Sequence, residues 1–244
     1  MKGVILAGGL GTRLEPLTRV TNKHLLPVYN QPMIYYPIRT LVDAGITKIL
    51  IVTGGNNAGD FLKLLGNGEE FGIHDIHYAY QQGEGGIADA LRLAENFIGK
   101  DRFVVMLGDN VIDVSIRPYV KEFSKQKTGA RILVKKVPDP KRFGVVRFNG
   151  DKITAIVEKP KNPPSDYIVT GIYMYDSLVF NFIRKLKPSK RGELEITDVN
   201  NMYLKKNELR FNILEGNWTD CGTFASLYRA NRLMAKKFPQ NPNL

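Results

Sequence analysis

Short apolar runs alternate with amphipathic stretches along the first 110 residues of the chain. Four runs have the length and apolar character of buried strands, at residues 3–6, 47–53, 76–80 and 103–107. Three helices are predicted between them, at residues 32–44, 60–65 and 86–97, and the first opens with Pro32, which suits a first helical turn. Strands separated by helices indicate a parallel sheet with right-handed crossovers, in which ligands bind at the carboxyl ends of the strands.

The pattern changes after residue 129, where predicted strands follow one another more closely, at residues 131–137, 144–148, 152–158 and 168–175. Helices are predicted at residues 177–186, 195–205 and 223–237, followed by a tail rich in proline and asparagine at residues 238–244. This order favours a mixed or antiparallel extension of the same sheet. The prediction is therefore a single α/β domain over residues 1–244, with a Rossmann-like, mostly parallel central sheet flanked by helices.

The composition indicates a soluble protein. The longest apolar stretches, such as residues 49–52, fall far short of the roughly 20 residues that a membrane helix needs. The apolar run at residues 4–7 is also too short for a signal peptide. Cys221 is the only cysteine, and the three histidines do not form a zinc-ligand pattern with it. We therefore expect a reduced, cytoplasmic setting without a membrane partner.

The formal charge of +11 fits three kinds of protein: a nucleic-acid binder, a basic protein that binds membrane surfaces, or an enzyme for multiply anionic small molecules. The basic residues are spread along the chain in short pairs such as Lys135 and Lys136. We therefore expect most of them to lie on a solvated surface, and we do not expect a nucleic-acid partner.

A glycine-rich segment, Gly8-Gly9-Leu10-Gly11-Thr12-Arg13-Leu14, directly follows the first predicted strand. Glycines allow a sharp bend that turns several backbone amides toward an anion such as a phosphate. The spacing matches neither a dinucleotide-binding fingerprint nor a P-loop, and a plain tight turn is equally common for such a segment. The adjoining Arg13 favours the phosphate interpretation, because a guanidinium can neutralise part of the charge of a triphosphate.

Two aspartates are candidate metal ligands. Asp109 follows the fourth predicted strand in Gly108-Asp109-Asn110, and Asp220 lies in Trp218-Thr219-Asp220-Cys221. Two carboxylates brought together would suit Mg²⁺, which also takes phosphate oxygens and water as ligands. Without a ligand role, Asp109 would be a turn residue and Asp220 a cap of the helix that follows. Lys23, before an apolar, proline-marked turn, is either a phosphate contact or an exposed structural lysine.

Further candidates lie in the second half of the chain. Glu158 and Lys159 end a predicted strand, where the lysine could hold a sugar phosphate and the carboxylate could accept hydrogen bonds from hydroxyl groups. A surface ion pair is the simpler alternative. Val169 and Tyr173 are most simply core or wall residues. The acidic run at residues 195–198 also fits an ordinary helix start.

Taken together and in their order, these motifs resemble the glucose-1-phosphate thymidylyltransferase family, a group of sugar nucleotidyltransferases also called dTDP-glucose pyrophosphorylases, in a short form. The resemblance rests on six separated segments from residue 2 to about residue 234, including the run Arg-Gly-Glu-Leu-Glu-Ile-Thr-Asp-Val-Asn at residues 191–200. It implies transfer of a nucleotide from dTTP to glucose 1-phosphate with release of pyrophosphate. It also implies a homo-oligomer, either a dimer or a tetramer.

The resemblance assigns roles to individual residues. The nucleotide would be bound in the part at about residues 1–128, and the sugar phosphate in the part at about residues 129–237. Arg13, Lys23, Asp109, Lys159 and Asp220 would carry the catalysis, with Mg²⁺ held by Asp109 and Asp220. The nucleotide would contact Leu6, Gly8, Gly9, Gly11, Thr12, Arg13, Gln81, Gly86 and Asp109. The sugar phosphate would contact Gly144, Glu158, Lys159, Val169, Tyr173 and Arg191.

The predicted base-binding stretch departs from the family, because it reads Gln81-Gln82-Gly83-Glu84-Gly85-Gly86 where bacterial members carry a Pro-Ser-Pro-Asp-Gly type of loop. A glutamine that reads a pyrimidine does not by itself reject uracil, so the choice between dTTP and UTP stays open, as does an aminosugar phosphate as the second substrate. A non-catalytic nucleotide-binding regulatory protein is a further alternative.

Overall fold

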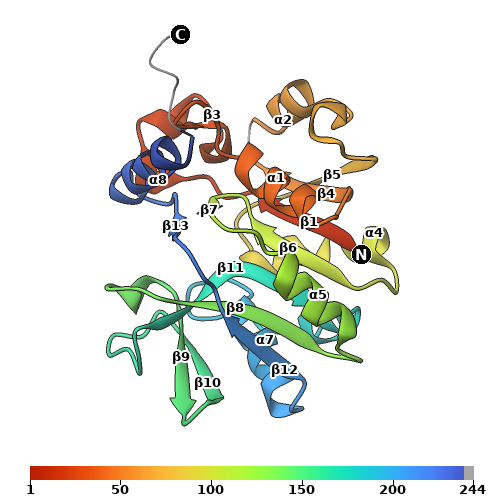
Figure 1. The fold of residues 1–244 in the computed structure, drawn as a ribbon, viewed down its shortest axis with the longest axis vertical. Helices are drawn as coiled ribbons and strands as arrows, with labels where there is room; N and C mark the ends of the chain where they lie inside the picture. Colours follow the sequence, from red (N-terminus) through yellow and green to blue (C-terminus); the bar gives the residue numbers. More distant parts are fainter. Residues whose placement is uncertain (56, 239–244) are drawn as a thin grey trace.

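The computed structural model describes residues 1–55 and 57–238, and its centre is a nine-stranded sheet (Figure 1). Seven strands lie in the order β10 (Lys152–Glu158), β9 (Gly144–Asn149), β11 (Tyr167–Tyr175), β6 (Phe103–Leu107), β1 (Lys2–Ala7), β4 (Lys48–Gly54) and β5 (Asp75–Gln81). Two more strands, β8 (Ala130–Lys136) and β12 (Leu209–Ile213), extend the sheet from β11. The sheet therefore includes strands from both halves of the chain.

The direction of the strands divides the sheet into two parts. Strands β5, β4, β1 and β6 run parallel to one another, so their carboxyl ends meet at one edge. Strand β11 runs antiparallel to β6, to β8 and to β9, and the β9–β10 pair is also antiparallel. The predicted α/β fold, with a mostly parallel centre and a mixed extension, is confirmed.

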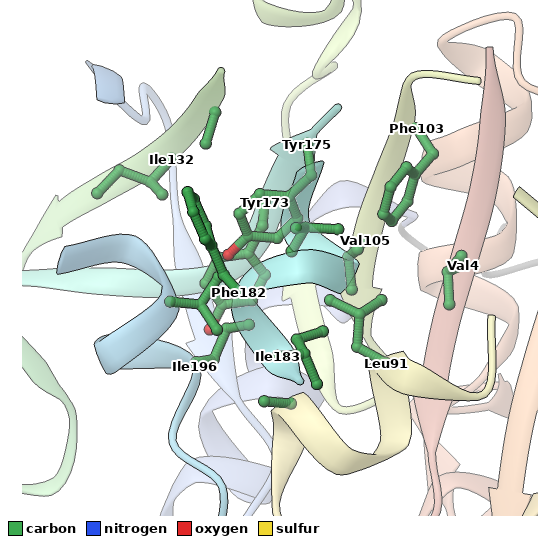
Figure 2. Close-up of a cluster of buried hydrophobic side chains, with 14 of the residues drawn as sticks. Val4, Leu91, Phe103, Val105, Ile132, Tyr173, Tyr175, Phe182, Ile183 and Ile196 are labelled. Carbon is green, nitrogen blue, oxygen red and sulfur yellow. The ribbon is translucent and has the colours of Figure 1, made fainter. Parts of the chain in front are cut away.

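Helices cover both faces of the sheet, because successive side chains of a strand point to opposite faces. In β1, Val4 and Leu6 join one buried cluster, whereas Ile5 and Ala7 join another. The first cluster lies under α3 (Ile87–Arg92), α6 (Leu178–Ile183) and α7 (Ile196–Lys205), and Figure 2 shows its side chains between the sheet and these helices. The second lies under α1 (Tyr35–Asp43), α2 (Ala58–Leu65) and α5 (Arg117–Lys125).

A third, smaller cluster holds the C-terminal helix α8 (Phe224–Lys237) against the N-terminal segment. It includes Leu14, Cys221 and Met234, all of which are fully buried. The side chain of Thr223 accepts a hydrogen bond from the Ser226 amide and begins the helix with a capping box. Asp220 is therefore not the cap of this helix, which removes the structural alternative for that residue.

The structure corrects two predicted helices. The helix expected at residues 32–44 begins only at Tyr35, because Pro32 belongs to β3 (Gln31–Pro32), which pairs with β2 (Pro27–Val28). The helix expected at residues 86–97 is two helices, α3 and α4 (Glu95–Ile98), which meet at residues 93–94. In both helices the spacing of the apolar residues correctly predicted which face is buried. The spacing does not show where the helical hydrogen bonds of the backbone begin or are interrupted.

Several elements were not predicted, namely α5, β12 and the short strands β7 (Asn110–Ile112) and β13 (Trp218–Asp220). A strand of three residues is too short to show an alternation of apolar and polar residues, so the sequence could not predict the β7–β13 pair. The proline- and asparagine-rich tail predicted at residues 238–244 lies outside the described residues from residue 239 onward. No helix among residues 1–55 and 57–238 combines the length and hydropathy needed to cross a bilayer.

A buried pair, Asn22 and His24, fastens the segment after the glycine-rich loop to the sheet. The Asn22 amide nitrogen donates to the carbonyls of Ala7 and Gly54, at the ends of β1 and β4. Its oxygen lies 2.7 Å from Nδ1 of His24, so that ring nitrogen carries the proton and donates. Burial, with a further contribution from the charge of Lys23, lowers the pKa of His24 from 6.5 to about 3.

This histidine should make the fold sensitive to acid. The unfolded chain binds a proton near pH 6.5 whereas the folded chain does not until about pH 3, so stability is fully present above pH 6.5 and falls as the pH drops through that window. Between pH 7 and pH 5 we expect a loss of about 2 kcal/mol from this residue alone. Urea unfolding of the wild type and His24→Gln, without divalent cations, measures it. If the free energy of unfolding fell equally in both proteins between pH 7 and pH 5, the lowered pKa of His24 would be contradicted.

Candidate active site

The candidate site lies at the edge where the parallel strands end. The glycine-rich loop follows β1, Gln81 is the last residue of β5, and Asp109 comes two residues after the end of β6. Because β5, β4, β1 and β6 all run parallel, these three segments emerge on the same side of the sheet. This is where ligands bind in open α/β sheets.

The glycine-rich loop bends over Lys23. Gly11 has a φ of +72°, a conformation that favours glycine, and it begins a short 3-10 turn over Thr12–Leu14. A Cβ at Gly11 would lie 2.8 Å from the Cβ of Lys23, so a side chain there would push the loop away. Leu14 is buried and anchors the loop, whereas Thr12 and Arg13 are exposed and line the cavity.

Asp109 is paired with Lys23 at the floor of the site. The Lys23 ammonium lies 2.5 Å from Oδ2 of Asp109, and both side chains are largely buried. Burial, the largest single influence, would raise the pKa of Asp109, but the Lys23 charge, His24 and the hydrogen bonds from Lys23 and Asn110 together hold this pKa well below its usual range. Asp109 is therefore an anion at any pH near neutrality.

Asp220 stands beside Asp109 because β13 pairs with β7. Asp220 is opposite Asn110 in this ladder, and the amide of Cys221 donates to the Asp109 carbonyl. Arg142 donates to Oδ2 of Asp220 over 2.7 Å. Burial and the negative charge of Asp109 raise the pKa of Asp220, although Arg142 opposes this. The two carboxylates therefore repel each other, and a cation between them would relieve that repulsion.

Asn110 connects the parts that hold the two aspartates. Its amide nitrogen donates to Oδ1 of Asp109 over 3.0 Å. Its oxygen accepts from the Gly171 amide of β11 over 3.0 Å and from Nε1 of Trp218 over 2.7 Å. With a side-chain exposure near zero, Asn110 ties the end of β6 to β11 and β13 in fixed geometry.

The second half of the chain supplies a group of charged residues on the far side of the cavity. Glu158 ends β10 and accepts a hydrogen bond from the Thr197 hydroxyl at the start of α7. Burial, chiefly, raises the pKa of Glu158. Lys159 follows with a φ of 39°, rare for a residue with a side chain, and its amide donates to the Phe143 carbonyl. Strained backbone of this kind clusters at functional sites.

Arg191 reaches the same group from the loop before α7. Its guanidinium lies 3.5 Å from carboxylate oxygens of both Glu158 and Glu195, and it also pairs with Glu193. The arginine therefore has three acidic neighbours. An anionic ligand at Arg191 would have to exchange with at least one of them.

Every residue predicted for the site lines at least one of two adjoining cavities, which have volumes of about 500 and 400 Å³. Gly9, Arg13, Lys23, Asp109 and Arg191 line both cavities. The first is also lined by Gly11, Thr12, Gly144, Glu158, Lys159, Val169, Tyr173 and Asp220. The second adds Leu6, Gly8, Gln81 and Gly86. The structure thus brings the predicted residues together, while their individual roles remain predictions.

Other residues of the site were missed in the sequence. Arg142 is the ion-pair partner of Asp220, and Thr197 is the hydrogen-bond partner of Glu158. Neither has a local signal, because each acts on a residue 39 or more positions away. Asn110 could have been noticed, since it directly follows Asp109 in the motif that the sequence analysis singled out.

Tyr173 is both a core residue and a wall residue of the cavity, the two roles considered for it in the sequence. It is 4% exposed and stacks on Tyr175 with 5.9 Å between the ring centroids, as a core residue does. It nevertheless contributes to the wall of the first cavity. A buried aromatic wall gives the cavity a rigid boundary next to Glu158.

Comparison with known proteins places this arrangement in a family. A model of the nucleotidyl transferase family matches residues 2–237. A glucose-1-phosphate thymidylyltransferase of Neisseria meningitidis is 47% identical over 94% of this chain and 81% of its own length, and one of an Actinoplanes strain is 43% identical. A crystal structure from Bacillus anthracis, described as the same enzyme with sucrose bound, superposes with a TM-score of 0.92 at 57% identity, over 96% of this chain and 94% of that one.

A UDP-glucose pyrophosphorylase solved with UDP-glucose shares the fold, with a TM-score of 0.84 at 24% identity. The match of the family model over nearly the whole chain and the identities above 40% agree with the geometry of the site. The chain therefore belongs to the nucleotidyl transferase family, within its glucose-1-phosphate thymidylyltransferase group.

Proposed function

We propose that this enzyme joins dTTP and glucose 1-phosphate into dTDP-glucose and releases pyrophosphate. One observation carries the proposal: Asp109 and Asp220 line a single cavity with the glycine-rich loop. Two carboxylates, loop amides and several basic side chains are the groups that a polyphosphate and a divalent cation require. The names of the relatives support the same pair of substrates.

The nucleotide fits the cavity lined by Leu6, Gly8, Gln81 and Gly86, with its phosphates toward Arg13. The sugar phosphate fits the other cavity, where Gly144, Glu158 and Val169 form the wall. The lining residues that the two cavities share include Gly9, Arg13, Lys23, Asp109 and Arg191. This arrangement supports a division in which residues 1–128 bind mainly the nucleotide and residues 129–237 mainly the sugar phosphate, within one domain over residues 1–244.

The residues present fit Mg²⁺ held by Asp109 and Asp220. The donors are hard carboxylate oxygens. Burial and then the negative charge of Asp109 raise the pKa of Asp220, and a cation would offset that charge. Within the described residues, no three His, Cys, Asp or Glu side chains gather as a metal cluster. Phosphate oxygens and water would complete the coordination. Bound Mg²⁺ supplies positive charge that offsets the charge on the α-phosphate and on the leaving pyrophosphate.

The reaction needs alignment more than proton transfer. An oxygen of the sugar phosphate attacks the α-phosphorus, a new P–O bond forms, and the bond to the β-phosphate oxygen breaks on the opposite side with its electron pair. The attacking oxygen is already deprotonated near neutral pH, so no general base is required. Lys159 and Arg191 hold the incoming phosphate, while Arg13 and the loop amides hold the triphosphate. Lys23, between the loop and Asp109, adds charge at the junction.

We also propose a cytoplasmic homo-oligomer, either a dimer or a tetramer, without nucleic-acid or membrane partners. Cys221 is buried, and burial raises the pKa of its thiol well above the usual value, so this thiol is unreactive. Light scattering after size exclusion gives the number of subunits directly.

A substrate screen tests the proposal. The wild type is offered dTTP, UTP, dATP or dGTP with glucose 1-phosphate or glucosamine 1-phosphate, and pyrophosphate release is measured. We expect the highest kcat/KM for dTTP with glucose 1-phosphate, with UTP about tenfold lower, because the two nucleotides differ only in the base methyl group and the ribose 2′-hydroxyl, and a methyl group in an apolar pocket gives only a modest difference. Preference for UTP or for the aminosugar phosphate would change the assignment. No release with any pair would indicate a regulatory protein.

Substitutions test the assigned residues. Asp109→Ala and Arg13→Ala should each lower kcat by about 100-fold or more, since each removes charge that offsets the transition state. Asp101→Asn is the matched control, because Asp101 pairs with Lys2 on the surface and its side chain is 57% exposed. Circular dichroism establishes that each variant is folded. Near-normal rates in either site variant would refute its role.

A further inference from the structure

The amide of Gln81 is held in one orientation. Its nitrogen Nε2 donates to Oδ2 of Asp89 over 3.0 Å and to the carbonyl of Gly86 over 3.2 Å. Both partners can only accept hydrogen bonds, so a flipped amide would place its oxygen against two acceptors. Gln81 is 5% exposed, which makes such a mismatch costly.

Asp89 is itself fixed from two sides. Arg92 donates to Oδ1 of Asp89 over 3.1 Å, which leaves Oδ2 for Gln81. Asp89 lies in the first turn of α3, where the helix dipole favours a negative charge. A Cβ on Gly85 would come within 2.5 Å of the Asp89 carboxylate, so the loop packs directly on it. Arg92, Asp89 and Gln81 thus form a chain from the surface to the cavity.

The orientation decides what Gln81 offers to a ligand. Its oxygen Oε1 lies beside Gly8, where a Cβ would come within 2.7 Å of it, and both residues line the nucleotide cavity. Among the described residues no hydrogen bond to Oε1 is formed. The cavity therefore presents an acceptor, and an acceptor pairs with a ring N–H of a base. Thymine and uracil carry a proton on N3, whereas cytosine has a lone pair there.

We propose that Asp89 is a positioning residue for base selection: by holding Nε2 of Gln81, it turns the amide oxygen toward the base, so that the site accepts thymine or uracil and rejects cytosine. Asp89 acts through Gln81 and does not touch the nucleotide. This inference rests on the proposed function, because it takes the cavity at Gln81 as the base site.

Binding of dTTP and dCTP to the wild type, Asp89→Asn and Asp101→Asn, measured by titration calorimetry with Mg²⁺, tests the inference. Asparagine has the same shape as aspartate, but it can donate as well as accept, so both orientations of the Gln81 amide become possible. We expect the ratio of the dCTP Kd to the dTTP Kd to fall about tenfold in Asp89→Asn. The ratio in Asp101→Asn should equal that of the wild type.

A merely structural role of Asp89 would weaken both nucleotides equally and leave the ratio unchanged, which would overturn the inference. A wild type that binds dCTP as tightly as dTTP would also overturn it. Asp89→Ala removes the acceptor without adding an amide and should lower the ratio similarly, so the test stands if either variant folds. Failure of the proposed function is distinguishable, since the wild type would then release no pyrophosphate from dTTP and glucose 1-phosphate.

Discussion

The structure depends on one short strand pair, β7 with β13, which places Asp220 beside Asp109 although 110 residues of chain separate them. Six paired residues would hold little by themselves. Asn110 reinforces the pair by bonding to Asp109, to Trp218 and to β11. Helix α8 then packs against β13. The parallel sheet fixes one aspartate, and this pair brings the other to it.

Bringing two carboxylates together has an electrostatic cost, and basic side chains from opposite parts of the chain offset it. Lys23 neutralises Asp109 and Arg142 neutralises Asp220. These ion pairs lower the cost of holding the two carboxylates close together. A divalent cation at the proposed metal site would lower it further. Arg191 is balanced by its glutamates in the same way. If the proposed site is right, a charged ligand would replace an internal ion-pair partner in each case.

Much of the fold followed from the sequence, because buried strands and amphipathic helices leave periodic patterns. The parallel centre, the mixed extension and the position of the glycine-rich loop were all predicted. Most site residues were predicted from the family resemblance, and they line the two cavities. What the sequence did not show depends on contacts between distant segments: the β7–β13 pair, the partnership of Arg142 with Asp220, and the hydrogen bond from Gln81 to Asp89. The break at residues 93–94 was missed because apolar spacing continues across it.

The most direct measurement is a crystal structure with Mn²⁺ in place of Mg²⁺ and a non-hydrolysable dTTP analogue, with diffraction data collected at the manganese absorption edge. The account predicts one anomalous peak within ligand distance of the carboxylates of both Asp109 and Asp220 and of a phosphate oxygen, with the triphosphate along the loop at residues 8–13. A peak bound to only one of the two aspartates, or a triphosphate lying away from the loop, would contradict it.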